Sequence, residues 1–142
     1  MSTAAASLRA LPLLTPANQF FWTAGQEGHL KILRCDACKH WLHPPVPICP
    51  ECLSRNLTPQ PVSGLGTIEA VTVNYHAWTP AADVPYAIGL VSLDDCPHVR
   101  ITSRIDCNDP TAVTIGMRVG VFFEHHEDVW LPFFKPTKAH QS

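Results

Sequence analysis

The chain has 142 residues, of which 46% are hydrophobic and only 15% charged, and it contains 14 prolines. This length allows one ordinary domain or two very small ones. Charged residues usually make up about 25% of a globular protein and proline about 5%, so the composition argues against charged disorder and against long solvated helices. We therefore expect a turn-rich protein that is mainly β.

The net charge of −2 at pH 7 argues against nucleic acid as a partner, since phosphate contacts need clustered Lys and Arg. The first 61 residues carry five basic and three acidic side chains, whereas the remainder carries five basic and nine acidic ones, a net −4. No run reaches 18 apolar residues, so no membrane span is predicted, and Pro12 interrupts the only candidate for a signal-peptide core. We expect a cytoplasmic protein with free thiols.

Four of the six cysteines form two Cys-x-x-Cys pairs, Cys35 with Cys38 and Cys49 with Cys52. Each pair can present two thiolates from one tight turn, and two such turns can complete a tetrahedron around a metal ion at about 2.3 Å per sulfur. In a reducing compartment the pattern favours a metal site over two disulfides. Four thiolates leave no open coordination position, so the predicted role of the metal is structural.

Zinc is the predicted ion, although a rubredoxin-like iron site uses the same four ligands and the sequence does not separate the two. His40 and His43 lie between the cysteine pairs and are alternative ligands, disfavoured because four cysteines are available. The metal would replace the core that a segment as short as 29–61 cannot supply.

A short helix is predicted over residues 15–25, before the cysteines. Its start and exit have suitable residues, namely Thr15, Pro16 and Gly25. One face is apolar at helical spacing, through Ala17, Phe20, Phe21 and Ala24. Because so short a helix is unstable alone, its apolar face must be covered. Either the face packs on its own chain, or Phe20 and Trp22 contact a ligand or a partner subunit.

After Pro61 the sequence changes to short strands rich in β-branched residues, expected at 66–75, 85–93, 98–105, 118–124 and 129–134. In the first of them the apolar positions shift phase between Ile68 and Val71, which indicates a bulge or strong bend. Five strands with a bent first strand predict a five-stranded Greek-key barrel of the OB-fold type. The predicted organisation is an N-terminal tail and helix over 1–28, a zinc ribbon over 29–61, the OB-fold over 62–136 and a C-terminal tail over 137–142.

The sequence offers little independent chemistry. It contains no G-x-S-x-G, P-loop, G-x-G-x-x-G or H-E-x-x-H motif. Cys96 and Cys107 have no assignable base beside them, and His125 and His126 fit a solvated hairpin tip better than a pH-sensitive or metal contact. We therefore assign no catalytic residue.

Several short motifs follow one another over roughly residues 18–136. They are Phe20-Phe21-Trp22, Gly28-His29-Leu30 before the first cysteine pair, the proline-rich stretch before Cys49-Pro50-x-Cys52, Gly64-x-Gly66-Thr67, Pro85-Tyr86, Gly116-Met117-x-Val119 and Pro132-Phe133-Phe134. In this order they resemble the DUF35-type family, which joins a rubredoxin-like zinc ribbon to an OB-fold. The chain departs from the family at Lys39, where Gly is usual, and at Asp94-Asp95, where many members have an acidic residue and Gly.

The resemblance implies a noncatalytic subunit of an acyl-CoA-processing hetero-oligomer that supports a thiolase-superfamily partner and helps bind the CoA thioester. That partner would be a thiolase, an acyltransferase or a retro-aldolase, with lipid or sterol side-chain degradation as its context. One alternative is an accessory subunit of a hot-dog-fold enoyl-CoA hydratase. Another is a single-stranded nucleic-acid-binding OB protein, which the negative barrel half disfavours.

A CoA thioester needs a few cations for its phosphates, a stacking surface for adenine and a narrow apolar slot for the pantetheine arm. The candidate cations lie near the predicted ribbon and on the predicted barrel: Arg34, Lys39, Arg55, Arg100 and Arg104. The alternative role for each of them is a solvated surface charge.

Overall fold

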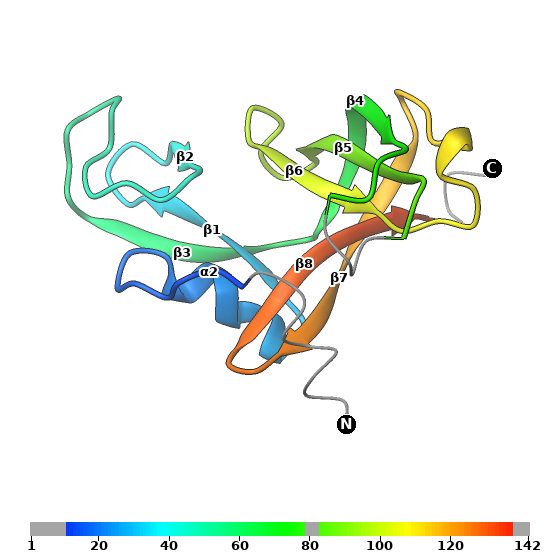
Figure 1. The fold of residues 1–142 in the computed structure, drawn as a ribbon. Helices are drawn as coiled ribbons and strands as arrows, with labels where there is room; N and C mark the ends of the chain where they lie inside the picture. Colours follow the sequence, from blue (N-terminus) through cyan, green and yellow to red (C-terminus); the bar gives the residue numbers. More distant parts are fainter. Residues whose placement is uncertain (1–10, 79–82, 138–142) are drawn as a thin grey trace.

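The computed structural model describes residues 11–78 and 83–137, which form a three-stranded ribbon sheet beside a closed five-stranded barrel (Figure 1). The tails predicted at the two ends lie mostly outside these residues. Within the described part of the chain, no helix is long and apolar enough to cross a membrane. The fold class is mainly β, as predicted.

The N-terminal helix is shorter than predicted. It consists of α2, Gln19–Thr23, and a 3-10 helix, η1, Ala24–Glu27. Ahead of it, Thr15 and Asn18 exchange hydrogen bonds: the Thr15 N–H donates to Asn18 Oδ1 (2.8 Å), and the Asn18 N–H donates to Thr15 Oγ1 (3.3 Å). Thr15 therefore stabilises the turn before the helix, and its backbone oxygen accepts from the N–H of Gln19 (2.9 Å).

The predicted helix exit at Gly25 is wrong. The chain leaves the helix at Gly28, whose φ of 80° is the left-handed conformation that glycine adopts freely. Gly25 has a different role, because a Cβ there would lie 2.5 Å from Phe123 Cδ1 and 2.6 Å from Trp130 Cβ. Its missing side chain allows the 3-10 helix to contact the barrel closely.

The ribbon sheet has the order β2-β1-β3, in which β1 (Leu30–Cys35) lies between β2 (Trp41–Leu42) and β3 (Leu57–Val62). β3 pairs with β1 from Leu57 to Val62 although it contains Pro59 and Pro61. The two prolines are two positions apart, so both place their missing N–H on the same side of the strand. An edge strand tolerates this when that side faces away from its neighbour.

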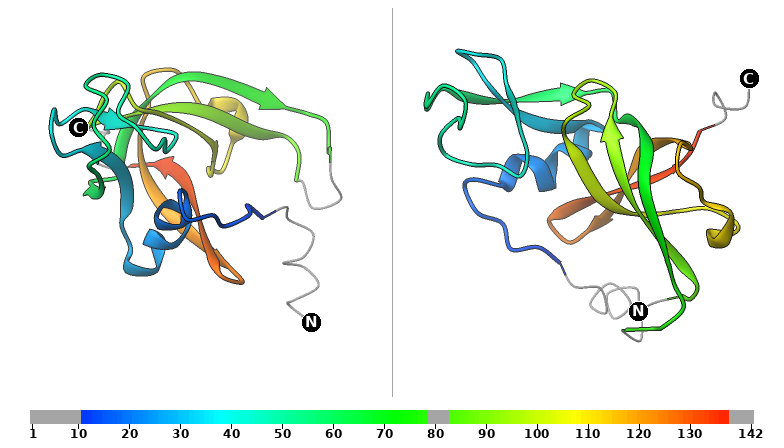
Figure 2. Two further views of the ribbon diagram at one scale, coloured as in Figure 1. Left: turned by 90° about the vertical axis from the view of Figure 1, so that its left-hand side faces the viewer. Right: turned by 90° about the horizontal axis from the view of Figure 1, so that it is seen from above.

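The barrel has the strand order β4-β5-β6-β8-β7 and is closed by pairing of β4 with β7, which confirms the predicted OB-fold class. Its strands are β4 (Leu65–Asn74), β5 (Tyr86–Leu93), β6 (Arg100–Ile105), β7 (Arg118–His126) and β8 (Val129–Pro136). The register between β4 and β5 shifts between Ile68 and Ala70, which confirms the predicted bulge. A 3-10 helix, η2 (Pro110–Ala112), precedes β7, and the far ends of β4 and β5 project from the barrel (Figure 2).

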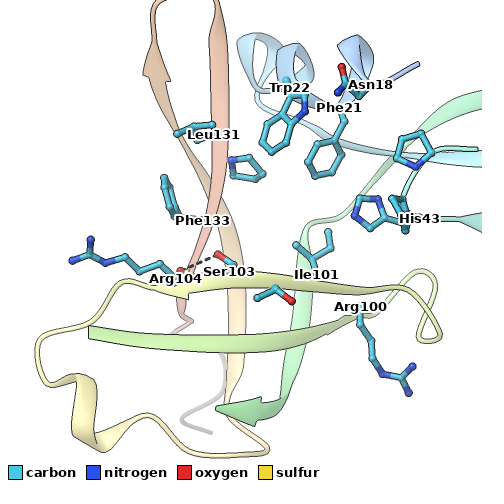
Figure 3. A pocket seen from close by; sticks show the side chains of 14 residues that line it. Asn18, Phe21, Trp22, His43, Arg100, Ile101, Ser103, Arg104, Leu131 and Phe133 are labelled. Carbon is cyan, nitrogen blue, oxygen red and sulfur yellow. Dashed lines mark hydrogen bonds between the residues drawn. The ribbon is translucent and has the colours of Figure 1, made fainter. Parts of the chain in front are cut away.

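The parallel pairing of β6 with β8 closes only one end of the seam between them. Ile105 pairs with Phe134, and the Asp106 N–H donates to the Phe134 oxygen (2.8 Å). Beyond this point the two strands diverge, and α2 lies over the opening (Figure 3). Side chains from α2, from the loop after β2 and from both strands line a cleft here.

One hydrophobic core joins the helix, the ribbon and the barrel. It includes Phe21 from α2, Leu30 and Ile32 from β1 and Val62 from β3, packed with barrel residues such as Phe134. A separate small cluster lies at the other end of the ribbon and contains Leu33, Cys35, Leu42 and Cys49. The ribbon is thus anchored to the barrel at one end, while its other end has little apolar material beyond the cysteines.

Candidate metal centre and adjoining cleft

The four predicted metal ligands lie together at the far end of the ribbon. The sulfur atoms of Cys35, Cys38, Cys49 and Cys52 all lie within 4.8 Å of one another. Cys35 Sγ is 3.5 Å from Cys52 Sγ, and Cys38 Sγ is 3.6 Å from Cys49 Sγ. A tetrahedron with metal–sulfur bonds of about 2.3 Å has edges of about 3.8 Å, so the donor set fits one metal ion. Both distances are far longer than the roughly 2.05 Å of a disulfide.

Equivalent backbone hydrogen bonds close the two cysteine turns. The Lys39 N–H donates to the Cys35 oxygen (2.9 Å), and the Leu53 N–H donates to the Cys49 oxygen (2.8 Å). Each turn thereby holds its two thiols on one side, which is the reason that the Cys-x-x-Cys spacing forms half of a tetrahedron.

Backbone N–H groups prepare the cluster for negative charge. The N–H of Cys38 points at the Cys35 sulfur (3.5 Å). Together with the N–H of Ala37, it lowers the pKa of Cys35 to about 6, although burial acts in the opposite direction. The N–H of His40 acts in the same direction on Cys38, yet burial and the neighbouring sulfurs raise the pKa of Cys38 to about 12. One thiolate therefore forms readily, and a bound cation would stabilise the others.

The two histidines considered as alternative ligands lie away from the sulfurs. The His40 ring stacks on the ring of His98, with centroids 4.9 Å apart and an interplanar angle of 18°. The His43 ring lies against Phe21, with centroids 5.1 Å apart. Both imidazoles therefore contact rings outside the ribbon.

A cleft of about 670 Å³ lies beside the ribbon, where β6 and β8 diverge (Figure 3). This volume is within the range of roughly 300–1,000 Å³ typical of small-molecule sites. Four segments form its walls: Asn18, Phe21 and Trp22 around α2, His43 to Pro45 after β2, Arg100 to Arg104 on β6, and Leu131 to Phe133 on β8. Most of the lining side chains are aromatic, aliphatic or proline, so the cleft suits an apolar group.

The five candidate cations have different surroundings in the structure. The Arg34 guanidinium lies 4.4 Å from the centre of the Trp41 ring, and its Nε donates to the Lys39 oxygen (2.9 Å). Arg34 therefore stabilises the ribbon itself. Lys39 and Arg55 are exposed on the ribbon and do not line the cleft.

Arg100 and Arg104 line the mouth of the cleft, but their guanidinium groups point away from its interior (Figure 3). Arg100 Nε donates to Glu69 Oε1 (2.5 Å), and the Arg104 guanidinium lies 5.3 Å from the centre of the Tyr86 ring. The interior of the cleft, as far as its described lining shows, is therefore uncharged.

The remaining two cysteines do not have the properties of nucleophiles. Burial is the main cause that raises the pKa of Cys96 to about 11, and it also raises the pKa of Cys107. Both thiols are therefore protonated at neutral pH.

The sequence did not reveal the cleft or the place of His43 within it. From its position between the cysteine pairs, the sequence indicates His43 only as an alternative metal ligand. A signal was present in the two prolines that follow it, since Pro44 and Pro45 restrict the backbone and so fix where the preceding imidazole lies.

Two family descriptions match consecutive parts of the chain. Residues 22–58 match "ChsH2, rubredoxin-like zinc ribbon domain", and residues 59–124 match "ChsH2, C-terminal OB-fold domain".

Two curated relatives are similar at the sequence level. The "Probable enoyl-CoA hydratase alpha subunit" of Thermomonospora curvata is 33% identical over 132 residues, which cover 92% of this chain and 41% of that protein. The "3-oxo-4,17-pregnadiene-20-carboxyl-CoA hydratase alpha subunit" of Mycobacterium tuberculosis is 32% identical over 119 residues, which cover 84% and 37%. The chain thus spans about two fifths of the length of either relative.

Two solved structures are similar in fold. A chain of the "Ltp2-ChsH2(DUF35) aldolase" matches with a TM-score of 0.80 and 31% identity, covering 89% of this chain and 98% of that one. A DUF35-family protein of unknown function from Sulfolobus solfataricus matches with a TM-score of 0.58 over 86% of each chain. The identity of the second pair is only 16%, so it supports the fold alone.

Proposed function

The chain belongs to the DUF35 family of ChsH2-type zinc-ribbon and OB-fold proteins, and from this premise we propose that it is a noncatalytic subunit of an acyl-CoA-processing complex. In this proposal it supports a catalytic partner of the thiolase superfamily and helps bind the CoA thioester. The similarity to the chain of the Ltp2-ChsH2 aldolase carries the proposal, because it extends over nearly all of that chain.

The chemistry of the described residues supports a noncatalytic role. Four sulfurs would occupy every position of a tetrahedral metal and leave none for a substrate or water. Burial keeps the thiols of Cys96 and Cys107 protonated at neutral pH. Reaction chemistry would therefore come from the partner.

We propose zinc as the ion of the cysteine cluster. Zinc accepts four thiolates in a tetrahedron and brings no redox chemistry, which suits a structural site. Iron is the alternative with the same ligands. Elemental analysis of the purified protein should find one zinc per chain, and the visible absorption of an iron–thiolate centre would contradict the assignment.

Among the five candidate cations, we propose Arg104 as the main contact for a CoA phosphate. It stands at the mouth of the cleft, and it forms no ion pair with any residue that the structure describes. Arg100 is at the same mouth but is paired with Glu69. The ring of Tyr86 beside Arg104 offers a face on which adenine could stack.

A partnership with a hydratase is the second candidate, because two relatives are named as hydratase alpha subunits. The chain spans only about two fifths of those relatives, so the match does not establish their activity for it. Single-stranded nucleic acid is a weaker candidate, because residues 62–142 carry five basic and nine acidic side chains.

Co-expression tests the proposal directly. The chain should be produced separately with a thiolase-superfamily protein and with a hot-dog-fold hydratase from the same genome, and each mixture passed through gel filtration. We expect co-elution with the thiolase-superfamily protein. Co-elution with the hydratase alone would establish the second candidate, and separate elution from both would overturn the subunit role.

A further inference from the structure

We propose that the cleft between β6 and β8 binds the uncharged acyl part of the thioester, and that His43 selects acyl groups carrying a hydrogen-bonding oxygen. The identity of the ligand as a thioester rests on the function proposed above. The chemistry of the occupant, a bulky apolar group with one neutral polar atom, follows from the cleft itself.

The walls of the cleft are built to contact an apolar body. Phe21 and Trp22 meet edge to face, with ring centroids 4.9 Å apart at 87°, so they present one fixed aromatic wall. Phe133 and Leu131 of β8 and Ile101 of β6 form the opposite walls (Figure 3). Three separate elements hold these side chains, and a site on packed elements is better defined than one on a loop.

The distribution of charge places the acyl group inside and the nucleotide outside. The two arginines of the lining turn away from the interior, one toward Glu69 and one over Tyr86. A phosphate inside would therefore lose its water without gaining a cation, which is strongly unfavourable. An apolar group loses nothing by the same transfer and is favoured there.

Four uncharged polar residues line the cleft, namely Asn18, His43, Thr102 and Ser103. Asn18 Oδ1 accepts from the Thr15 N–H, Ser103 Oγ donates to the Arg104 oxygen, and Thr102 is exposed. His43 differs from these three. Its ring is half-buried against Phe21, and among the described residues neither ring nitrogen has a hydrogen-bond partner. Burial lowers the pKa of His43, so the imidazole is neutral at pH 7 and offers one donor and one acceptor. A neutral donor in an apolar site favours a carbonyl or hydroxyl oxygen over both a carboxylate and a plain hydrocarbon.

A pair of matched probes tests this inference without CoA. 1-Adamantyl methyl ketone and 1-ethyladamantane have similar shapes, but only the ketone has a hydrogen-bonding oxygen. Both should be titrated into the full, metal-loaded chain while the indole N–H signal of Trp22 and the imidazole nitrogen signals of His43 are followed by NMR. We expect both probes to shift Trp22 saturably and only the ketone to shift His43.

Three variants test whether His43 causes the preference for the ketone over the hydrocarbon. The His43→Phe variant should bind the ketone about fivefold more weakly and the hydrocarbon as well as before, because one net hydrogen bond is lost. The His29→Phe variant changes an exposed histidine that does not line the cleft and should behave as wild type. The Leu131→Trp variant should fill the cleft and block both probes. If a variant fails to fold, the wild-type spectra still test whether both probes shift Trp22 and only the ketone shifts His43.

The inference fails if neither probe binds, or if His43→Phe leaves the preference between ketone and hydrocarbon unchanged. It also fails if the probes do not bind while Leu131→Trp abolishes co-elution with the catalytic subunit, because the cleft would then receive a protein side chain. A separate titration with free CoA tests the proposed function. Binding of the ketone without any effect of CoA or a partner would overturn that function and leave the cleft assignment standing.

Discussion

Lys39 and Leu53 occupy equivalent places in the two cysteine turns, and both have left-handed backbone conformations, with φ of 67° and 65°. Each follows the second cysteine of its pair. The left-handed conformation costs a residue with a Cβ roughly 1–2 kcal/mol, whereas glycine adopts it freely. The resemblance implies a Gly at the position of Lys39, and Gly would adopt this conformation freely, whereas Lys39 adopts it at a local energetic cost.

Replacing Lys39 with Gly should stabilise the protein. The relief of the left-handed strain exceeds the added entropy of the unfolded glycine, so we expect the free energy of unfolding to rise by about 0.5–1 kcal/mol. Urea unfolding of the metal-loaded protein would measure this change in the free energy of unfolding. Arg55→Gly is the matched control, because Arg55 is exposed on the same ribbon without a positive φ, and it should lower stability. Destabilisation by Lys39→Gly would contradict the strain interpretation.

Replacing Cys35 or Cys49 with Ser should release the metal and unfold the outer end of the ribbon. The small cluster there contains both cysteines and has only Leu33 and Leu42 as its other buried members. Metal content and amide exchange of residues 33–58 would report the two effects. Cys107→Ser is the control, since Cys107 lies on the barrel, and it should retain the metal. Full metal content in Cys35→Ser would remove the cysteine cluster as the binding site.

A methyl group at Gly25 should separate the 3-10 helix from the barrel. The added Cβ would lie 2.5 Å from Phe123 Cδ1 and 2.6 Å from Trp130 Cβ, so one of the two elements must move. We expect Gly25→Ala to lower the free energy of unfolding by about 1–3 kcal/mol, as overpacking does. Gln26→Ala, at the exposed neighbouring position, should change it little. Equal stability of the two variants in thermal unfolding would show that the contact is not limiting.

The pair of Asp94 and Arg118 should give stability that depends on pH. Arg118 donates to both carboxylate oxygens of Asp94, at 2.7 and 2.5 Å, and this hydrogen bonding lowers the pKa of Asp94. The carboxylate is therefore stabilising above its unfolded pKa of about 3.9, and the contribution is lost as the pH falls through the lower folded pKa.

Urea midpoints of wild type and Asp94→Asn measure this effect. The variant should be less stable at pH 7, and the difference should shrink between pH 4 and lower values. A metal held by the cysteines would leave both proteins in acid, so the difference between them isolates the ion pair. Asp128→Asn, which removes a carboxylate from an exposed hairpin turn, is the matched control. A difference that persists unchanged in acid would assign the stabilisation to something other than charge.

The elements that follow local rules were predictable from the sequence. The spacing of Cys35, Cys38, Cys49 and Cys52 defines two turns whatever surrounds them, and the phase shift after Ile68 records the bulge that the register confirms. The helix exit was missed because Gly25 and Gly28 both satisfy the local pattern of a helix end. Only the approach of Phe123 and Trp130, about a hundred residues later, gives Gly25 its role.

The candidate cleft depends on contacts between distant segments and was not predictable. It exists because β6 and β8 part beyond Ile105 and Phe134, and because the loop after β2 brings His43 to the opening. Similarly, the sequence makes Arg34 one of five candidate cations, and only the structure shows that its guanidinium lies over Trp41. Charge alone does not distinguish a guanidinium that contacts a ligand from one that stabilises its own chain.

The central claim, that this chain is a required but noncatalytic subunit, is tested most directly by the activity of a thiolase-superfamily partner toward its acyl-CoA substrate. The kcat/KM of the isolated partner should be measured with no addition, with the wild-type chain and with Cys35→Ser. We predict that the wild-type chain raises kcat/KM to saturation at a fixed molar ratio, that the metal-free variant does not, and that the chain alone is inactive. A partner that is equally active at every concentration of the chain would contradict the account.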